Sequence, residues 1–250
     1  MDIEKLMLIL WRRYTTLNPD AKRINRLIKE CREQVTNDHI AFRTFDHPKI
    51  NINQMAKTFI KLGYKECGQY VFEKKKLIAK HYEHSSSAYP KIFISQLQIK
   101  QCSRYLQNTI KTLLKQMDLN SVEDNCLPLG GRIWPAFKTK TYQRLLKESE
   151  YAAWTATFGL RANHFTLLVN DIKTFSHLKT FNTFLKNSNI QLSQSGGEIK
   201  GNPQVYLEQS STIAPLVNAT FTEGEMKIPG CYYEFAYRHP MENGNLFNGF

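Results

Sequence analysis

Apolar residues recur along this chain at helical spacing in some segments and at strand spacing in others. Residues 2–14 and 19–33 each place an apolar stripe on one helical face, and Asn18 with Pro19 supplies an N-cap and a first helical residue. Residues 37–45 are rich in β-branched and aromatic side chains and lead into a turn. The pattern predicts two helices followed by a strand.

A helix and three strands follow that first strand. Apolar residues from Ile52 to Ile60 recur at helical intervals, and Gly63 ends the helix. Strand patterns then occupy residues 69–73, 77–83 and 91–99. The predicted order of elements is β-α-β-β-β.

The same order returns in the second half of the chain. Helical patterns at residues 102–117 and 142–158, joined by an irregular link, separate the two halves. The second half then has a strand at 163–169, a helix from 172 to 185, and strands at 190–193, 198–200, 205–209 and 231–237. A repeat carries more weight than any single element, because it constrains the whole fold.

We therefore predict an α+β fold in which two βαβββ modules form one cupped central sheet or barrel with flanking helices. At 250 residues the chain is long enough to form one large domain. The predicted parts of this single domain, 1–250, are N-terminal helices (1–35), a first module (36–100), a helical linker (101–160), a second module (161–240) and a tail (241–250).

The net charge of +12 raises the question of a nucleic-acid partner. Residues 1–150 hold the whole excess, with 27 basic against 15 acidic residues. The basic residues are scattered over amphipathic segments, and only Lys74–Lys76 form a run, between two predicted strands. No nucleic-acid-binding signature accompanies them. We expect no nucleic-acid partner, and a positive field that attracts small dianionic substrates.

Cysteine usage and the N-terminal residues bear on the compartment. The five cysteines are widely spaced without a C-x-x-C pair, which argues against a disulfide framework and a thiolate zinc site. The first residues are acidic and the apolar run Leu6–Trp11 is short, unlike a signal peptide or a membrane span. We expect a cytoplasmic protein with no membrane partner, and the sequence leaves the oligomeric state open.

Candidate chemistry lies on strands at related positions of the two modules. His39 lies on the first strand of module one, and the strand period puts Arg43 on the same face. His164 lies on the first strand of module two, and Glu234 on its last strand. In a pseudo-twofold pair these strands meet, and two histidines with one carboxylate form the facial triad typical of Fe(II) or another borderline divalent ion.

Each of these residues also has an ordinary structural explanation. A strand histidine beside an aspartate is more often a hydrogen-bonded core residue than a ligand. A buried carboxylate at Glu234 needs a cation or hydrogen-bond donors, and Arg238, four residues further on, is an alternative to a metal. The symmetry-related position on the last strand of module one falls near Ser95 or Gln96, which offer no carboxylate, so the site would stay open.

Six blocks of sequence between the first strand and Arg238 resemble one known family. They are Asn37–Phe45, Pro90–Leu97, Ser149–Trp154, Asn163–Thr166, Gln209–Ala214 and Tyr233–Arg238. Together they are similar to the DUF1338 family, whose characterised members are 2-oxoadipate dioxygenase/decarboxylases. The fold of that family is related to the vicinal oxygen chelate proteins, which agrees with the predicted βαβββ modules.

The resemblance implies an Fe(II) cofactor bound by His39, His164 and Glu234, with a small 2-oxo diacid and O2 as reactants. It assigns the catalytic, substrate-binding arginine to Arg43, which would hold the distal carboxylate of the diacid. The implied reaction converts 2-oxoadipate and O2 to 2-hydroxyglutarate and CO2. Two further candidates for substrate contact are Gln209 and Ser210, with strand-end capping as the alternative.

One departure from the family pattern and two rival functions stay open. Gln96 stands where the family has a glutamate, so a charge close to the predicted site is missing. A ring-cleaving dioxygenase or a glyoxalase-type enzyme on the same scaffold would keep the three ligands without needing Arg43. A non-catalytic module that binds an acidic ligand would need no metal.

Overall fold

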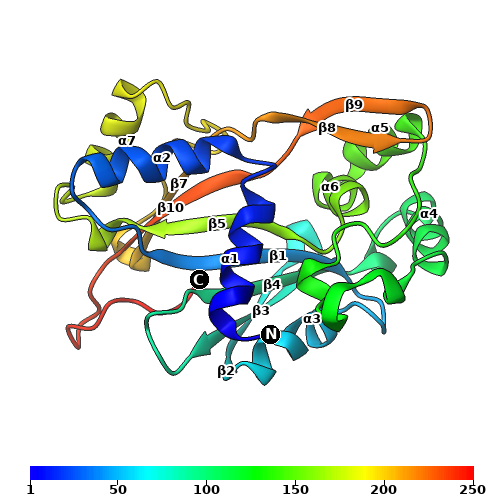
Figure 1. The fold of residues 1–250 in the computed structure, drawn as a ribbon, viewed down its shortest axis with the longest axis horizontal. Helices are drawn as coiled ribbons and strands as arrows, with labels where there is room; N and C mark the ends of the chain where they lie inside the picture. Colours follow the sequence, from blue (N-terminus) through cyan, green and yellow to red (C-terminus); the bar gives the residue numbers. More distant parts are fainter.

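An eight-stranded sheet runs through the computed structural model, which describes all residues 1–250 (Figure 1). The strand order is β2-β3-β4-β1-β5-β10-β7-β6, and the sheet curls into a half-barrel. These strands are β1 (Asn37–Phe45), β2 (Tyr64–Phe72), β3 (Leu77–His84), β4 (Lys91–Leu97), β5 (Ala162–Leu168), β6 (Lys200–Asn202), β7 (Leu207–Ser211) and β10 (Tyr232–Arg238).

The strand order consists of two copies of one four-stranded unit. In each copy the first strand pairs in parallel with the last, β1 with β4 and β5 with β10. A parallel pair needs a crossover connection, and the helices α3 (Ile52–Lys61) and α7 (Leu178–Asn187) lie in equivalent positions of the two units. The two first strands, β1 and β5, pair antiparallel at the centre. The predicted α+β fold of two βαβββ modules is confirmed.

Five further helices cover the sheet, four of which have one apolar face, whereas the last is buried on every side. They are α1 (Ile3–Tyr14), α2 (Pro19–Glu30), α4 (Arg104–Lys115), α5 (Thr139–Glu148) and α6 (Glu150–Phe158). Figure 1 shows α1 crossing the sheet over β5 and β1, and Trp11 and Tyr14 of α1 pack on Phe165 of β5 with ring centroids 5.2 and 4.8 Å apart. One continuous apolar core includes residues of both modules.

The largest differences from the predicted elements concern two helices and one strand, and β2 also begins at Tyr64 instead of residue 69. The helix predicted at 142–158 is two helices, because Ser149 adopts an extended conformation and caps α6 by accepting a hydrogen bond from the backbone of Ala152. The helix predicted from 172 begins only at Leu178, after a 3-10 turn at Val169–Asp171. The strand predicted at 190–193 contributes only a bridge from Leu192 to Thr212.

A hairpin was not predicted. Strands β8 (Leu216–Phe221) and β9 (Gly224–Pro229) pair with each other in a separate two-stranded sheet. Most of their residues are exposed, and such strands carry little of the apolar periodicity on which prediction depends.

Helix α6 is buried on every side and is fixed to the sheet by hydrogen bonds. The hydroxyl of Tyr151 contacts the backbone of Thr44 on β1 and both the backbone and the hydroxyl of Ser95 on β4. The indole of Trp154 donates to the carbonyl of Gly230 at 2.8 Å. These contacts place the first turn of α6 beside the middle of the sheet.

Gly159 ends α6 with a φ of +77° and lies against the backbone of Gly131. We expect Gly159→Ala to lower the free energy of unfolding by about 3 kcal/mol or more, since a left-handed φ costs about 1–2 kcal/mol and overpacking about as much again. Gly196→Ala is the matched control, because Gly196 has a φ of +76° with no atom closer than 3.7 Å to the added carbon. Urea unfolding measures the loss of unfolding free energy in both variants. Equal losses would show that the close contact with Gly131 does not constrain residue 159.

Candidate metal centre

Three side chains able to bind a metal ion, His39, His164 and Glu234, converge in the middle of the sheet. They project from β1, β5 and β10, which are neighbouring strands. The register places Thr166 of β5 opposite both His39 and Glu234. The ligand atoms of the three residues all lie within 4.8 Å of one another. The structure therefore brings together the three ligands predicted from the sequence.

Both imidazoles are held through Nδ1, which leaves Nε2 facing the carboxylate. His39 Nδ1 lies 2.7 Å from Asp38 Oδ2, and His164 Nδ1 lies 3.0 Å from Asn163 Oδ1. The Nε2 atoms of the two histidines lie 3.4 and 3.8 Å from Glu234 Oε1. Metal-binding histidines usually donate their other ring nitrogen to such an oxygen, so the arrangement fits a metal centre.

The protonation states of His164 and Glu234 also fit a cation. Burial lowers the pKa of His164 to about 3, although Glu234 opposes the shift, so this imidazole is neutral at pH 7. Burial alone would also lower the pKa of His39, but hydrogen bonds to Asp38 and Glu234 raise it overall. Burial would raise the pKa of Glu234, but the two histidines and a hydrogen bond from Thr166 outweigh it and lower the pKa. Glu234 is therefore an ionised carboxylate.

Two further side chains orient that carboxylate. The Thr166 hydroxyl donates to Glu234 Oε1 at 3.1 Å and lies 3.0 Å from His39 Nε2. The Gln209 amide donates to the same carboxylate oxygen at 2.7 Å. Two imidazole nitrogens and one carboxylate, oriented in this way, suit a borderline divalent ion such as Fe(II).

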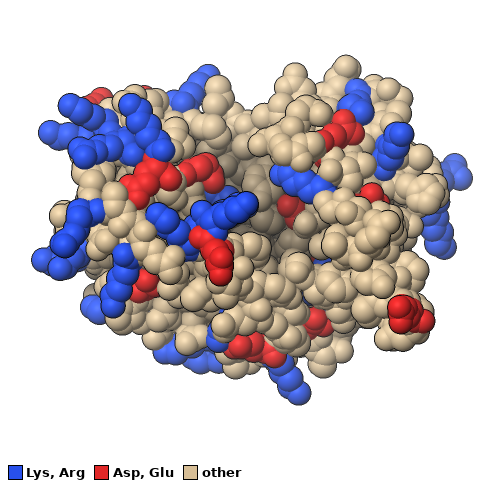
Figure 2. All heavy atoms as spheres, turned by 180° about the vertical axis from the view of Figure 1, so that it is seen from behind, with Lys and Arg blue, Asp and Glu red and all other residues tan.

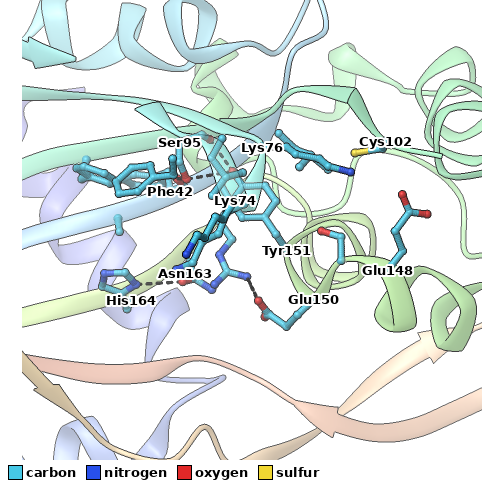
Figure 3. A pocket seen from close by; sticks show the side chains of 18 of the residues that line it. Phe42, Lys74, Lys76, Ser95, Cys102, Glu148, Glu150, Tyr151, Asn163 and His164 are labelled. Atoms are coloured by element: carbon cyan, nitrogen blue, oxygen red, sulfur yellow. Dashed lines mark hydrogen bonds and ion pairs between the residues drawn. The ribbon is translucent and has the colours of Figure 1, made fainter. Parts of the chain in front are cut away.

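A cavity of about 490 Å³ adjoins this cluster (Figure 3). In the view of Figure 3, His164 lies at one end of the cavity and Glu148 at the other. Arg43 lines it, as do Tyr232, whose ring stacks on His164 with centroids 4.6 Å apart, and the turn Lys74–Lys76 between β2 and β3. A pocket of this size suits a small molecule.

Arg43 is fixed in the cavity by a carboxylate and two aromatic rings. Its Nη1 donates to both oxygens of Glu150 on α6, at 2.9 and 3.1 Å. The guanidinium also lies over the rings of Tyr151 and Trp154, 5.0 and 5.3 Å from their centroids. The Glu150 contacts use only Nη1, so the remaining N–H groups are available to a ligand.

Surface charge is mixed on the face seen in Figure 2. Basic and acidic side chains are interspersed there around a central hollow, without a continuous basic stripe.

None of the helices has both the length and the apolar character that crossing a membrane requires.

Other site residues are placed differently from the predictions. Ser210 is buried and donates its hydroxyl to Asn182 on α7 at 2.7 Å, so the structure does not bring it to the site with Gln209. Gln96 accepts a hydrogen bond from the backbone of Ile52 at the start of α3, so the absent charge lies at a helix end and not beside the ligands. Consecutive side chains along a strand point to opposite faces of the sheet, which explains why Ser210 and Gln96 lie away from the site.

The symmetry-related position of Glu234 is also different from the prediction. Glu234 is paired with Thr166, and the equivalent pair in module one is Phe93 with Ala41. The position is therefore Phe93, not Ser95 or Gln96. An apolar side chain stands there, so module one contributes a single ligand.

Arg238 does not pair with Glu234, which removes one alternative to a metal. Its Nε and Nη2 donate to the two carboxylate oxygens of Asp38, at 2.6 and 2.8 Å. Sequence reasoning missed Asp38, Thr166 and Glu150 as parts of the site. The adjacency of Asp38 to His39 was a usable signal, because carboxylates commonly orient metal-binding imidazoles.

Comparisons with known proteins point to one family. A sequence profile described as 2-oxoadipate dioxygenase/decarboxylase matches residues 2–133 and 131–246. The chloroplastic 2-oxoadipate dioxygenase/decarboxylase of Arabidopsis thaliana is 32% identical over 246 residues. That match covers 90% of this chain and 65% of the plant protein, so the chain spans just under two thirds of the length of this relative. The cytoplasmic location expected here stays a prediction.

Solved structures share the whole fold. A Shewanella frigidimarina protein with a provisional hydrolase name has 45% sequence identity and a TM-score of 0.94, covering 100% of this chain and 97% of its own. The hydroxyglutarate synthase of Oryza sativa, solved in complex with 2-oxoadipate, has 29% identity and a TM-score of 0.85, covering 96% of this chain and 81% of its own. Both similarities extend over the two modules.

Neighbouring residues on β7 provide a test of the metal centre. We expect Gln209→Leu to weaken Co(II) binding about tenfold, because loss of a hydrogen bond to a ligand usually costs 10- to 100-fold in affinity. Ser210→Ala should leave Co(II) affinity unchanged and lower the free energy of unfolding by about 1 kcal/mol. Absorbance titration and urea unfolding measure the two effects. Equal Co(II) affinities in the two variants would show that Gln209 does not support the centre.

Proposed function

Because this chain belongs to the 2-oxoadipate dioxygenase/decarboxylase family, as its six sequence blocks indicated, we propose that it is an Fe(II)-dependent dioxygenase and decarboxylase of a 2-oxo dicarboxylic acid. The substrate that we propose is 2-oxoadipate, which the Oryza sativa hydroxyglutarate synthase binds in its crystal structure. The products would be 2-hydroxyglutarate and CO2. One O2 supplies both oxygen atoms that the products gain, so the reaction balances without a further reductant.

The observation that carries the proposal is the placement of Arg43 relative to the metal-binding cluster. His39 and Arg43 lie four residues apart on β1, and strand alternation directs both toward the same side of the sheet. His164 and Arg43 line one cavity. A ligand that reaches the metal centre through this cavity therefore meets a fixed guanidinium.

The proposed ligands of the iron are Nε2 of His39, Nε2 of His164 and the carboxylate of Glu234. When bound, Fe(II) would supply the redox chemistry by which O2 reacts with a 2-oxo acid. The protein's own contribution is positional. Asp38 and Asn163 hold the two imidazoles through Nδ1, so their Nε2 atoms face the site before any ligand arrives.

Arg43 is proposed to bind the distal carboxylate of the substrate. A guanidinium binds a carboxylate by charge-assisted hydrogen bonds, and its planar fork selects for position as well as charge. Glu150 and the rings of Tyr151 and Trp154 keep Arg43 in place, so little side-chain entropy is lost when the substrate binds. A diacid is thereby favoured over a monoacid.

Apolar residues complete the wall of the cavity near the metal-binding cluster. Phe93 of β4 and Ala41 of β1 line it, and the ring of Tyr232 covers His164. In such surroundings the charges of Arg43 and Glu234 act more strongly than in bulk water.

Turnover should depend on iron, O2 and the three proposed ligands. We expect protein loaded with one equivalent of Fe(II) to form CO2 and 2-hydroxyglutarate from 2-oxoadipate in equal amounts, one of each per O2 consumed. His39→Ala and His164→Ala should each lower the activity by about 100-fold or more, and each should also lose the bound iron. An oxygen electrode, product analysis and iron content measure these effects. His177→Ala, on an exposed histidine, is the control. Equal turnover by metal-free protein would refute the proposal.

Arg43 should determine the preference for diacids. We expect Arg43→Met to lower kcat/KM for 2-oxoadipate about 100-fold, since a hydrogen bond to a charged group contributes about 1.5–3 kcal/mol. The value for 2-oxohexanoate, a monoacid of the same length, should change less than about threefold, and Arg43→Lys should fall between. A loss that is equal for both substrates would exclude the proposed contact and favour an enzyme that does not use Arg43 for binding.

A further inference from the structure

Arg238 and Asp38 form an ion pair that is almost completely buried. Arg238 uses both Nε and Nη2, which donate to the two oxygens of the carboxylate at 2.6 and 2.8 Å. The side chains are 4% and 3% exposed. Both oxygens of the Asp38 carboxylate accept hydrogen bonds from the guanidinium, and this contact favours the ionised carboxylate.

Asp38 joins this ion pair to a proposed metal ligand. Its Oδ2 lies 2.8 Å from Arg238 Nη2 and 2.7 Å from His39 Nδ1. An ionised carboxylate accepts only, so Nδ1 of His39 carries the shared proton. The guanidinium therefore fixes the oxygen that in turn fixes the imidazole.

A register shift in β1 makes this contact possible. Along β1, Asn37 pairs with Leu167 and His39 with Thr166, so Asp38 is an additional residue with no partner in the pairing. Neighbouring side chains of a regular strand point to opposite faces, whereas a bulge can bring them to the same side. The bulge thus turns Asp38 toward the imidazole that follows it.

The remaining nitrogen of the Arg238 guanidinium, Nη1, binds the backbone of residues 247–249. It donates to the carbonyl oxygens of Phe247 and Gly249, at 2.8 and 2.9 Å. The ring of Phe250 lies edge-on to His39 with centroids 4.7 Å apart. One arginine therefore fixes the hydrogen-bond partner of His39 and also the backbone beside the ring that packs on it.

We propose that Arg238 is a positioning residue of the metal centre, which acts on His39 through Asp38. This inference rests on the proposed function, because it assumes that His39 binds a metal ion. Without the two-pronged contact, the carboxylate of Asp38 is free to rotate and no longer holds the His39 ring with Nε2 toward Glu234. The rival explanation is that the ion pair only ties β10 to β1 and stabilises the fold.

Co(II) affinity distinguishes the two explanations. Arg238→Lys keeps the charge but loses the fork, and Asp38→Asn removes the carboxylate. We expect each to weaken Co(II) binding about 10- to 100-fold, which is typical for partners of metal ligands. The double variant should bind no more weakly than Asp38→Asn alone, since Arg238 acts through Asp38. Arg161→Lys, at a half-buried arginine outside the site, controls for loss of a guanidinium and should change affinity less than twofold.

The imidazole of His39 supplies a second measurement that needs no metal. In the metal-free wild-type protein, its Nδ1 proton should give a downfield, slowly exchanging NMR signal, assigned by its loss in His39→Ala. Arg238→Lys and Asp38→Asn should shift this signal upfield or abolish it, while thermal unfolding verifies that each variant is folded.

The outcomes separate this inference from the proposed function. Wild-type protein that binds neither Co(II) nor Fe(II) would contradict the proposed function and with it a role at a metal centre, and the NMR signal would then decide only whether Arg238 orients the His39 ring. Unchanged Co(II) affinity in folded Arg238→Lys, or an unchanged Nδ1 signal, would overturn the inference. If Arg238→Lys does not fold, Asp38→Asn decides it in the same way, since the proposed action passes through Asp38.

Discussion

The antiparallel pairing of β1 with β5 is the constraint on which the rest of the structure depends. It joins the first strands of two equivalent modules, so His39 and His164 come to lie side by side although 125 positions separate them in the chain. Strand β10 pairs in parallel with β5 and brings Glu234 beside the two histidines. A slip of one residue in either pairing would turn a ligand to the other face of the sheet. The cluster is thus a property of register.

Buried charge is the second constraint, and each buried charge has a partner. Asp38 is matched by Arg238, and Glu234 is surrounded by donors from Thr166 and Gln209. Desolvating an unpaired carboxylate costs several kcal/mol, so these contacts hold the site together even in the absence of a ligand. Together with the contact between His164 Nδ1 and Asn163, they orient all three proposed metal ligands. A preformed site of this kind needs little reorganisation when a cation arrives.

Much of the fold and the three candidate ligands could be predicted because they depend on periodicity. Period two and the repeated βαβββ order place His39, His164 and Glu234 without knowledge of any contact. The remaining features depend on local irregularities that carry no periodic signal. The bulge at Asp38 decides which face that carboxylate takes, and Ser149 breaks what appears in the sequence as one helix. The hydrogen bond from the Ser210 hydroxyl to Asn182 also carries no periodic signal.

The charge distribution around the cavity explains part of the basic excess of the first 150 residues. Arg43 and the turn Lys74–Lys76 line the cavity together with the carboxylates of Glu148 and Glu150. Glu148 is engaged by the backbone and hydroxyl of Ser103, and Glu150 contacts only one nitrogen of Arg43. The cavity therefore carries more positive than negative charge at positions open to a ligand. A small dianion is electrostatically complementary to that positive charge, whereas a nucleic acid requires a basic surface that extends beyond one pocket. The positive charge thus supports a small acidic substrate over a polymeric partner.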